Sequence, residues 1–245
     1  MGFKKLKKLL LKITPKKILN LYQEPIKNQL RELDSYSTHS YSQEGEDLIL
    51  KRIFEGQKTG LYVDVGAHHP KRFSNTYLFY KMGWRGINID AMPGSMDEFK
   101  KIRPEDLNLE IAISQKLETL MFYILNEPAL NTFDKLSAEK YLINTKYKII
   151  EKKELKTFPL GEVLVKYNSE RKQIDFMSID VEGLDLSVLK SNDWIKFKPL
   201  IILVELLEMK SISEIQKSEI YIYLISNGYR FFAKTINTCF FKYSD

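Results

Sequence analysis

The sequence predicts an α/β fold with a mostly parallel, doubly wound sheet and a C-terminal antiparallel hairpin. Three observations lead to this prediction. Apolar runs of strand length, typical of strands covered on both faces, alternate with segments of helical periodicity. Glycine or acidic residues close three of these runs, where a parallel sheet of this kind places its ligands. Near the C-terminus, two aromatic-rich runs are separated by only a short turn, which indicates an antiparallel pair.

The first half of the chain alternates helix and strand after its first forty residues. Ser42 is a suitable N-cap for the first helix, because acids follow in the first turn and an apolar stripe continues to Phe54. Pro93, Gly94 and Ser95 form a typical helix start. The expected helices are 41–54, 74–84 (capped by Ser74 or Asn75) and 96–102, and the expected strands are 61–67, 86–91 and 107–114.

The second half begins with a less regular stretch, residues 115–172, which contains short strand-like runs at 120–125 and 147–158 and a helical pattern at 160–167. No internal repeat or low-complexity linker divides the chain. We therefore expect an N-terminal arm at 1–40 and one domain at 41–245, with an insertion at about 126–172. The remaining expected elements are strands 174–183 and 199–206, helices 184–190 and 212–226, and a hairpin of 229–235 with 239–243.

Positive charge is concentrated in the N-terminal arm. Residues 1–31 contain eight lysines and Arg31 but only one acid, Glu24, whereas the whole chain has a net charge of +6. The remaining residues therefore carry a slightly negative net charge. A body of this kind lacks the broad basic surface of a nucleic-acid-binding protein, so we expect no nucleic acid partner.

The arm has the pattern of a basic amphipathic helix. Phe3, Leu6, Leu10 and Ile13 recur at helical spacing, and lysines occupy the other face. This pattern fits peripheral membrane contact through residues 1–20. It also fits a helix packed on the domain or a disordered segment. The arm lacks the long apolar centre and cleavage site of a signal peptide.

The composition is that of an ordinary soluble protein, with 44% hydrophobic and 29% charged residues. Cys239 is the only cysteine, so no intramolecular disulfide can form. The expected compartment is therefore the reducing cytoplasm, at the inner face of the membrane if the arm binds there. No stretch approaches the roughly 18–20 continuous apolar residues that a membrane span needs.

Three strand ends carry residues that point to a ligand. Gly66 ends the first strand, Asp90 ends the second, and Asp180 and Glu182 end the fourth. An acid about 20 residues after a glycine turn typically accepts hydrogen bonds from ribose hydroxyls. Asp90 lies 24 residues after Gly66. Such an acid repels a 2′-phosphate, which weighs against NADP.

The loop that follows the first strand argues against a ligand with a pyrophosphate. A dinucleotide pyrophosphate binds a GxGxxG loop at a helix N-terminus, whereas GAHHPKR (66–72) offers one glycine. S-adenosylmethionine (SAM) removes this mismatch, because it contains adenosine and a methionyl arm but no phosphate. Its sulfonium is cationic, and Asp64, Asp180 and Glu182 suit that charge. The sequence therefore favours SAM over NAD.

Residues 41–206 contain long characteristic segments in a fixed order: YSQEGEDL, YVDVGAHHPKRFSNTYLFYKMGWRGINIDAMPGSMDEFKKIRP, NLEIAIS, NEPALNTF and DFMSIDVEGLDLSVL. These segments resemble the FkbM family of methyltransferases. The resemblance implies a class I, Rossmann-like methyltransferase that uses SAM. Family members are generally O-methyltransferases, and bacterial members often belong to surface-polysaccharide or glycan biosynthesis.

The resemblance also implies cofactor contacts along the strand ends. The loop departs from the family pattern at Pro70, where a third glycine is common. The matching positions are Gly66, Ala67 and the loop to Asn75 for the methionyl arm, Asp90 and Ala91 for the ribose, Ala112 or Ile113 for adenine, Asp180 for the sulfonium side, and Gln43 for closure over the cofactor.

Methyl transfer to oxygen requires the acceptor hydroxyl to lose a proton, and the candidate bases are His68, His69, Asp180 and Glu182. We favour His68, because a histidine with an unperturbed pKa near 6.5 accepts a proton at neutral pH and because it lies closest to the turn. Asp180 and Glu182, at i and i+2 on an extended strand end, should point the same way. With Glu205 they could bind Mg²⁺, although we favour hydrogen bonding to cofactor and acceptor.

The segment NEPALNTF (126–133) offers Glu127 and Asn131 to a polyhydroxylated acceptor, and His69 and Arg72 are further candidates for acceptor binding. The segment is not the N/D-P-P-Y signature of amine-methylating enzymes, so DNA and protein amines are disfavoured. We expect transfer to a sugar hydroxyl, on a sugar nucleotide or a growing glycan. The alternatives are a small metabolite or lipid-linked acceptor, and a catalytically inactive scaffold that recruits glycan enzymes. A nicotinamide-dependent dehydrogenase ranks last.

Overall fold

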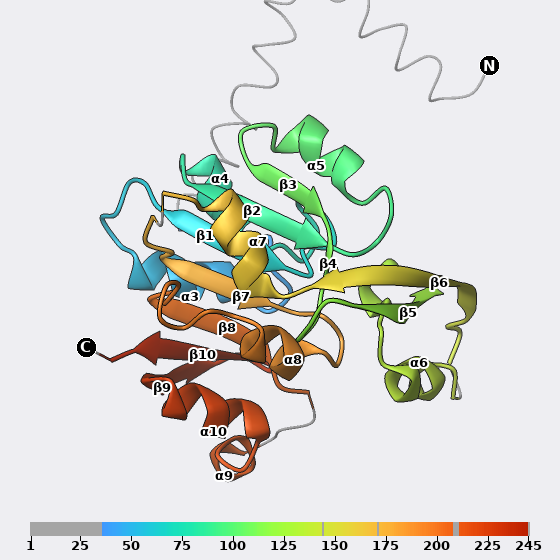
Figure 1. Ribbon diagram of the computed structural model, residues 1–245. Helices are drawn as coiled ribbons and strands as arrows, with labels where there is room; N and C mark the ends of the chain where they lie inside the picture. The colour runs from blue at the N-terminus through green and yellow to red at the C-terminus, as the bar shows by residue number, and fades with distance from the viewer. Residues whose placement is uncertain (1–35, 144, 171, 208–210, 245) are drawn as a thin grey trace, which may run out of the picture. The chain divides into compact units, whose positions relative to one another are not determined.

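The computed structural model describes residues 36–143, 145–170, 172–207 and 211–244 (Figure 1). The chain divides into two compact units, Met1–His39 and Ser40–Asp245, and the described helices and strands belong to the second. The expected helical arm falls almost entirely outside the described residues, so its membrane contact stays a prediction. Within the described ranges, no helix has the length and apolar character needed to cross a membrane.

A seven-stranded sheet forms the centre of the second unit, in the order β3-β2-β1-β7-β8-β10-β9. Its first five strands are parallel, and β10 and β9 are antiparallel additions at one edge. This arrangement confirms the predicted doubly wound sheet and its C-terminal hairpin. The strands are β1 Leu61–Val65, β2 Arg85–Asp90, β3 Leu107–Glu110, β7 Phe176–Ile179, β8 Ile201–Glu205, β9 Tyr229–Lys234 and β10 Thr238–Tyr243.

The two faces of this sheet are covered by different helices, as the alternation of side chains along a strand requires. Val63 faces the core shared with α7, α8 and α10, whereas its neighbour Tyr62 faces the core shared with α3 and α4. Burial of each large apolar side chain contributes about 1.5–3 kcal/mol. The helices around the sheet are α3 Glu46–Ile53, α4 Tyr77–Lys81, α5 Met96–Ile102, α7 Leu160–Tyr167, α8 Asp185–Lys190, α9 Ile212–Ile215 and α10 Glu219–Ser226.

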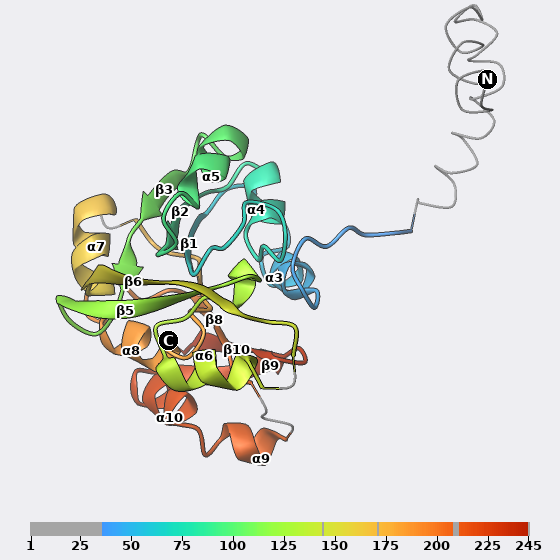
Figure 2. The ribbon, with the colours of Figure 1, turned by 90° about the vertical axis from the view of Figure 1, so that its right-hand side faces the viewer.

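The irregular stretch of the sequence folds into a second, three-stranded sheet in the order β4-β6-β5. This sheet and α6 lie together beside the carboxyl ends of the central strands in both ribbon views (Figures 1 and 2). Its elements are β4 Ala112–Ile113, β5 Glu118–Leu125, the 3₁₀ helix η1 Pro128–Leu130, α6 Lys135–Tyr141 and β6 Ile149–Phe158.

The expected strand at 107–114 is wrong as one element, because its two halves belong to different sheets. Residues 107–110 pair with β2 in the central sheet, and Ala112 and Ile113 pair with β6. The chain changes sheet at Ile111, whose N–H donates to the Asp90 carbonyl at 3.0 Å. The segment LNLEIAIS (107–114) has an apolar residue at every second position from Leu107 to Ile113, so its pattern gave no sign of the change.

Three expected helices also differ from the structure in their bounds, and the one expected at 74–84 spans only Tyr77–Lys81. The helix expected at 212–226 is broken before α10, where the Ser218 hydroxyl accepts the Tyr221 N–H. The first helix begins at Glu46, after Gly45 in the left-handed region, instead of at Ser42. The Ser42 hydroxyl still accepts the N–H groups of Gly45 and Asp47. Although Ser42 lies outside the helix, it therefore provides hydrogen-bond acceptors for backbone N–H groups at the helix start.

Candidate active site

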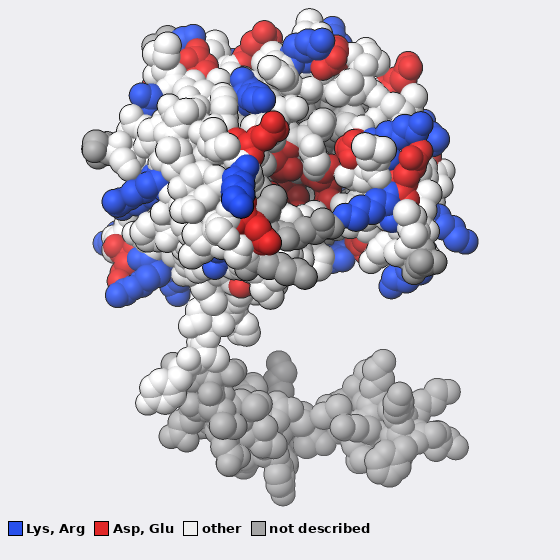
Figure 3. All heavy atoms as spheres, turned by 90° about the horizontal axis from the view of Figure 1, so that it is seen from below, with Lys and Arg blue, Asp and Glu red and all other residues white. Residues whose placement is uncertain are grey.

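A cleft of about 830 Å³ lies at the carboxyl ends of the central strands. The strand order reverses between β1 and β7, and a parallel sheet binds its ligands at such a switch point. Val65 pairs with Ile89 on one side and with Ile179 on the other. The loops that follow β1, β2 and β7 therefore begin near one another at the same edge of the sheet. Figure 3 shows the hollow with acidic side chains deep inside it.

Gly66 allows the two central loops to approach each other at this point. Its φ is +84°, and a Cβ there would lie 1.7 Å from the Asp180 carbonyl oxygen. The N–H groups of Gly66 and Ala67 both donate to the Ile89 carbonyl. The sequence predicted that this glycine lets a ligand approach closely, which stays a prediction, and the contact that the structure shows is with the Asp180 backbone.

Asp90 fixes the loop that follows Gly66. Its carboxylate accepts the His68 N–H and the Met92 N–H, each at 2.8 Å, and burial raises its pKa. His68 has a φ of +51°, which the hydrogen bond to Asp90 helps to hold. A carboxylate accepts about four hydrogen bonds, so Asp90 keeps capacity for a ribose hydroxyl in the cleft that it lines.

The two adjacent histidines differ in their surroundings. The Nδ1 atom of His69 accepts the N–H groups of Lys71 and Arg72, so this ring closes the loop. The Nε2 atom of His68 is buried and has no hydrogen-bond partner among the described residues. Burial and the nearby Arg72 lower the pKa of His68, which keeps its imidazole neutral at pH 7. Enclosure of Nε2 weighs against the predicted role of His68 as the base.

The loop after β7 carries the acidic centre of the cleft. The strand ends at Ile179, and Glu182 has a φ of +49°, so the extended strand end expected at 180–182 is wrong. The Asp185 carboxylate instead holds a turn by accepting the N–H groups of Val181 and Gly183. This turn still directs the acids together, because one carboxylate oxygen from each of Asp180, Glu182 and Glu205 lies within 4.8 Å of the other two.

The second sheet and its helix hold Glu182 in place. The Thr132 hydroxyl donates to the Glu182 carbonyl, and the Tyr141 hydroxyl donates to its carboxylate. A Cβ on Gly183 would lie 3.3 Å from the Asp134 Cβ, so the turn packs directly on this lobe. The second sheet and α6 therefore form one wall of the site and stabilise an unfavourable backbone conformation at Glu182.

Burial and mutual repulsion disfavour ionisation of these acids. Burial raises the pKa of Glu182 to about 7, and burial followed by the charge of Glu182 raises the pKa of Glu205 to about 8. Asp180 opens onto the cleft but is otherwise surrounded by protein, so burial and Glu205 raise its pKa well above the ordinary range. Such a group of acids favours a ligand that brings positive charge or donates protons.

Replacement of Glu205 by glutamine is expected to stabilise the protein at alkaline pH. A carboxyl group whose pKa rises from 4.5 to about 8 on folding destabilises the folded state increasingly between these pH values. Neighbouring acids titrate together with Glu205, which reduces the effect of this one residue. We therefore expect the free energy of unfolding to rise by about 2 kcal/mol at pH 8.5 and to change little at pH 5. Urea unfolding at both values measures it, with the exposed Glu151→Gln variant as control. Equal gains at the two pH values would contradict this account.

Most residues expected at the site do line this cleft. Ala112 does not, because alternation along the strand turns Ile111 and Ile113 toward the cleft and Ala112 away. Those that line it are Gln43, Asp64, Gly66, Ala67, His68, His69, Arg72, Asn75, Asp90, Ala91, Ile113, Glu127, Asn131, Asp180 and Glu182.

Several of these side chains are already engaged within the protein. Arg72 and Glu127 form an ion pair of 3.0 Å, which links the glycine loop to the second sheet. The Asn75 amide donates to the Ser178 hydroxyl at 3.0 Å, and the Asn131 side-chain oxygen accepts the Leu125 N–H. These contacts show how each side chain is positioned, and their binding roles stay predictions.

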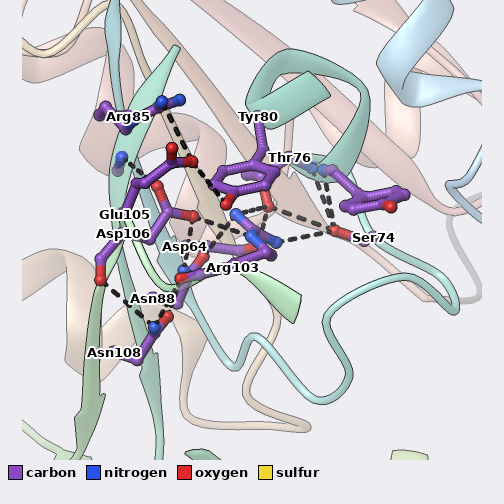
Figure 4. A network of polar contacts seen from close by, with 12 residues as sticks. Asp64, Ser74, Thr76, Tyr80, Arg85, Asn88, Arg103, Glu105, Asp106 and Asn108 are labelled. Carbon is purple, nitrogen blue, oxygen red and sulfur yellow. Dashed lines mark hydrogen bonds and ion pairs between the residues drawn. The ribbon is translucent and has the colours of Figure 1, made fainter. Parts of the chain in front are cut away.

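Asp64 joins the cleft to a buried polar network around Arg103 (Figure 4). Its carboxylate accepts the Thr76 hydroxyl at 2.7 Å, and burial raises its pKa to about 6 against the opposing effect of Arg103. Arg103 is fully buried and donates to Asp106, Tyr62, Thr76 and Asn88. Sequence reasoning missed Arg103, because no periodicity distinguishes a buried arginine from an exposed one.

Other wall residues were also missed or given no role in binding. Apolar walls come from Ile111, Met92 and Phe122, and polar groups come from Tyr141 and from the turn before β10. The missed residues belong to segments far apart in the chain, so no local motif could have joined them.

Comparison with known families gives a match to the Methyltransferase FkbM domain over residues 64–231. Among solved structures, the chain is similar to a TehB-like SAM-dependent methyltransferase from Corynebacterium glutamicum. The two share 11% sequence identity with a TM-score of 0.37, over 91% of this chain and 99% of that chain. No curated protein gives a significant match.

Proposed function

Because the chain belongs to the FkbM methyltransferase family, for which SAM is the implied cofactor, we propose that it transfers a methyl group to a sugar hydroxyl in surface-glycan biosynthesis. The observation that carries the proposal is the cleft at the switch point, with Asp90 at one strand end and the acids around Asp180 at another. Hydroxyl groups of a sugar are suitable partners for these carboxylates, which accept hydrogen bonds.

The residues of the cleft fit SAM. Asp90 offers acceptor oxygens to a ribose diol, and Ile111 and Ile113 provide an apolar wall for an adenine ring. The acids around Asp180 suit a cation, and Gly66 places no side chain in the space beside Asp180. The lining contains no basic cluster for a pyrophosphate, because Arg72 is its one lysine or arginine among the described residues.

When bound, SAM supplies an activated methyl group on a positively charged sulfur. The chain's own contribution begins with orientation, since alignment of reacting groups corresponds to effective molarities of order 10⁵–10⁸ M. Glu182, whose pKa is about 7, is suited to accept the proton of the acceptor hydroxyl through the carboxylate oxygen that Tyr141 does not occupy. Tyr141 orients that carboxylate, and Asp180 lies beside it.

Replacement of Glu182 by glutamine is expected to lower kcat by about 10²–10⁴, the usual contribution of a general base, with little change in cofactor affinity. Glutamine retains an oxygen for the Tyr141 hydroxyl but cannot accept the proton. The matched variant is His68→Ala, for which we expect a smaller loss, since its Nε2 is enclosed. Steady-state kinetics and calorimetry with S-adenosylhomocysteine separate the two effects. A larger loss in His68→Ala would restore His68 as the base.

A divalent cation is the alternative role of the acidic centre. The oxygen atoms of Asp180, Glu182 and Glu205 are of the kind that Mg²⁺ prefers. We favour hydrogen bonding without a metal, so activity should survive EDTA treatment and desalting. Loss of activity that Mg²⁺ restores would favour the alternative.

Two measurements test the proposed function as a whole. Calorimetry should detect binding of S-adenosylhomocysteine, and a nicotinamide dinucleotide should bind more weakly. Mass spectrometry should then detect methyl transfer from labelled SAM to a sugar-containing fraction. Absence of cofactor binding would favour the scaffold alternative, whereas transfer only to non-sugar molecules would favour a small-metabolite acceptor.

A further inference from the structure

The lining of the cleft is strongly acidic for a slightly acidic protein body. Nine carboxylates line it, and Arg72 is the one lysine or arginine among the described lining residues. Arg72 is paired with Glu127, so its charge is largely neutralised. Figure 3 shows acidic atoms inside the hollow and the basic side chains mainly on the outer surface. At alkaline pH, where the lining carboxyls with raised pKa values are ionised, the electrostatic field in the cleft is therefore negative.

Glu44 and Glu46, which line the cleft, are held by neutral hydrogen-bond partners. The backbone and side-chain N–H groups of Asn237 donate to the Glu44 carboxylate at 2.8 Å each. Glu46, which is buried, accepts the Thr235 hydroxyl and the Glu44 N–H. No lysine or arginine among the described residues forms an ion pair with Glu44, Glu46 or Glu205. These acids therefore add their charge to that of the centre around Asp180.

One carboxylate oxygen of Glu205 lies within 4.8 Å of one from Asp180 and one from Glu182, so these groups are close enough to repel one another. The charges of Glu182, Asp185, Glu44 and Glu46 all raise the pKa of Glu205, after the larger effect of burial. An anionic ligand group in this space would meet the same repulsion, and among the described lining residues only Arg72, already paired with Glu127, carries a basic side chain. Acceptor hydroxyl groups, in contrast, can donate hydrogen bonds to the carboxylates.

We propose that the cleft selects an uncharged sugar unit of a glycan as acceptor and excludes sugar nucleotides. This inference rests on the proposed function and narrows its acceptor class. In a sugar nucleotide the diphosphate is attached directly to the sugar ring. Delivery of a ring hydroxyl to Glu182 would therefore carry at least two negative charges into the carboxylate-lined space. A sugar unit joined to other sugars brings no such charge.

The test uses UDP, the anionic part of many sugar nucleotides, as the probe. Calorimetry is performed at pH 8.5 on the full-length protein saturated with S-adenosylhomocysteine, so that the cofactor region is filled. The wild type should show no measurable UDP binding at millimolar concentration. The double variant Glu182→Gln/Glu205→Gln should bind UDP measurably, at least about tenfold more tightly than the wild-type detection limit, because two repulsive charges are removed. Absence of UDP binding by both proteins would count against the proposal. The matched control is Glu151→Gln/Glu154→Gln on the exposed strand β6, which should behave as the wild type.

Binding of UDP to the wild type as tight as to the double variant would overturn the proposal. A labelling experiment provides the second measurement, with phosphate-free oligosaccharides and sugar nucleotides incubated separately with labelled SAM. Label in the oligosaccharides alone supports the proposal, and label in the sugar nucleotides overturns it. Failure of S-adenosylhomocysteine to bind would instead refute the proposed function, so the two failures are distinguishable.

Discussion

Replacement of Arg103 by methionine is expected to lower the free energy of unfolding by about 3–5 kcal/mol, the usual effect of breaking a buried ion pair. The side chains of Arg103 and Asp106 are both fully buried and are 2.8 Å apart. Methionine has a similar volume but no donor, so the Asp106 carboxylate would lose its charged partner. Tyr62, Thr76 and Asn88 would each lose a hydrogen-bond partner as well.

The matched control is Arg85→Met, on the strand next to Asp64. Arg85 also pairs with a carboxylate, Glu105 at 3.1 Å, but both side chains are largely exposed. Exposed pairs contribute about 0–1 kcal/mol, so this variant should remain close to the wild type in urea unfolding. Equal effects in the two variants would show that burial of the Arg103 network is not what stabilises this part of the fold.

Replacement of Gly66 by alanine is expected to weaken cofactor binding, with an affinity for S-adenosylhomocysteine lowered at least about 100-fold, which corresponds to about 2.7 kcal/mol. Two effects act together. Alanine disfavours the φ of +84°, at a cost of about 1–2 kcal/mol. Its Cβ would also overlap the Asp180 carbonyl, so the two loops would have to separate. Separation would move Asp180 away from Asp90 and widen the cleft.

Gly83→Ala separates these two effects. Gly83 has a φ of +98°, but a Cβ there would meet nothing within 4 Å, and the residue does not line the cleft. This variant should lose about 1–2 kcal/mol of stability and bind S-adenosylhomocysteine as the wild type does. Calorimetry and urea unfolding on both variants make the comparison. Normal cofactor binding by Gly66→Ala would contradict the central position given to this contact.

The sequence predicted the fold class because its signals are local. The buried character of β1 and the terminal hairpin can be recognised in single windows of the chain, since strand and helix periodicities differ. The place of Gly66 and Asp90 in one cleft also followed from position alone, because residues at the ends of parallel strands gather at one edge of a sheet.

The composition of the cleft depended on the tertiary structure. Glu44 and Asn237 are 193 residues apart and meet only because β10 is inserted beside β8. The Glu182 side chain lies near Asp180 and Glu205 because its backbone adopts a left-handed conformation, in a turn that Thr132 and Asp185 stabilise. The spacing rule for strands does not describe such a turn.

Sequence by itself thus determined the family resemblance, the doubly wound sheet and the strand ends where a ligand would lie. Only the tertiary structure decided that the chain leaves the central sheet at Ile111, that Arg103 is buried, and that the acids of distant segments share one cleft. The physical reason is that the two kinds of interaction act over different distances along the chain. Backbone periodicity and turn preference act over a few residues, whereas burial and electrostatic repulsion depend on whichever segments folding brings together.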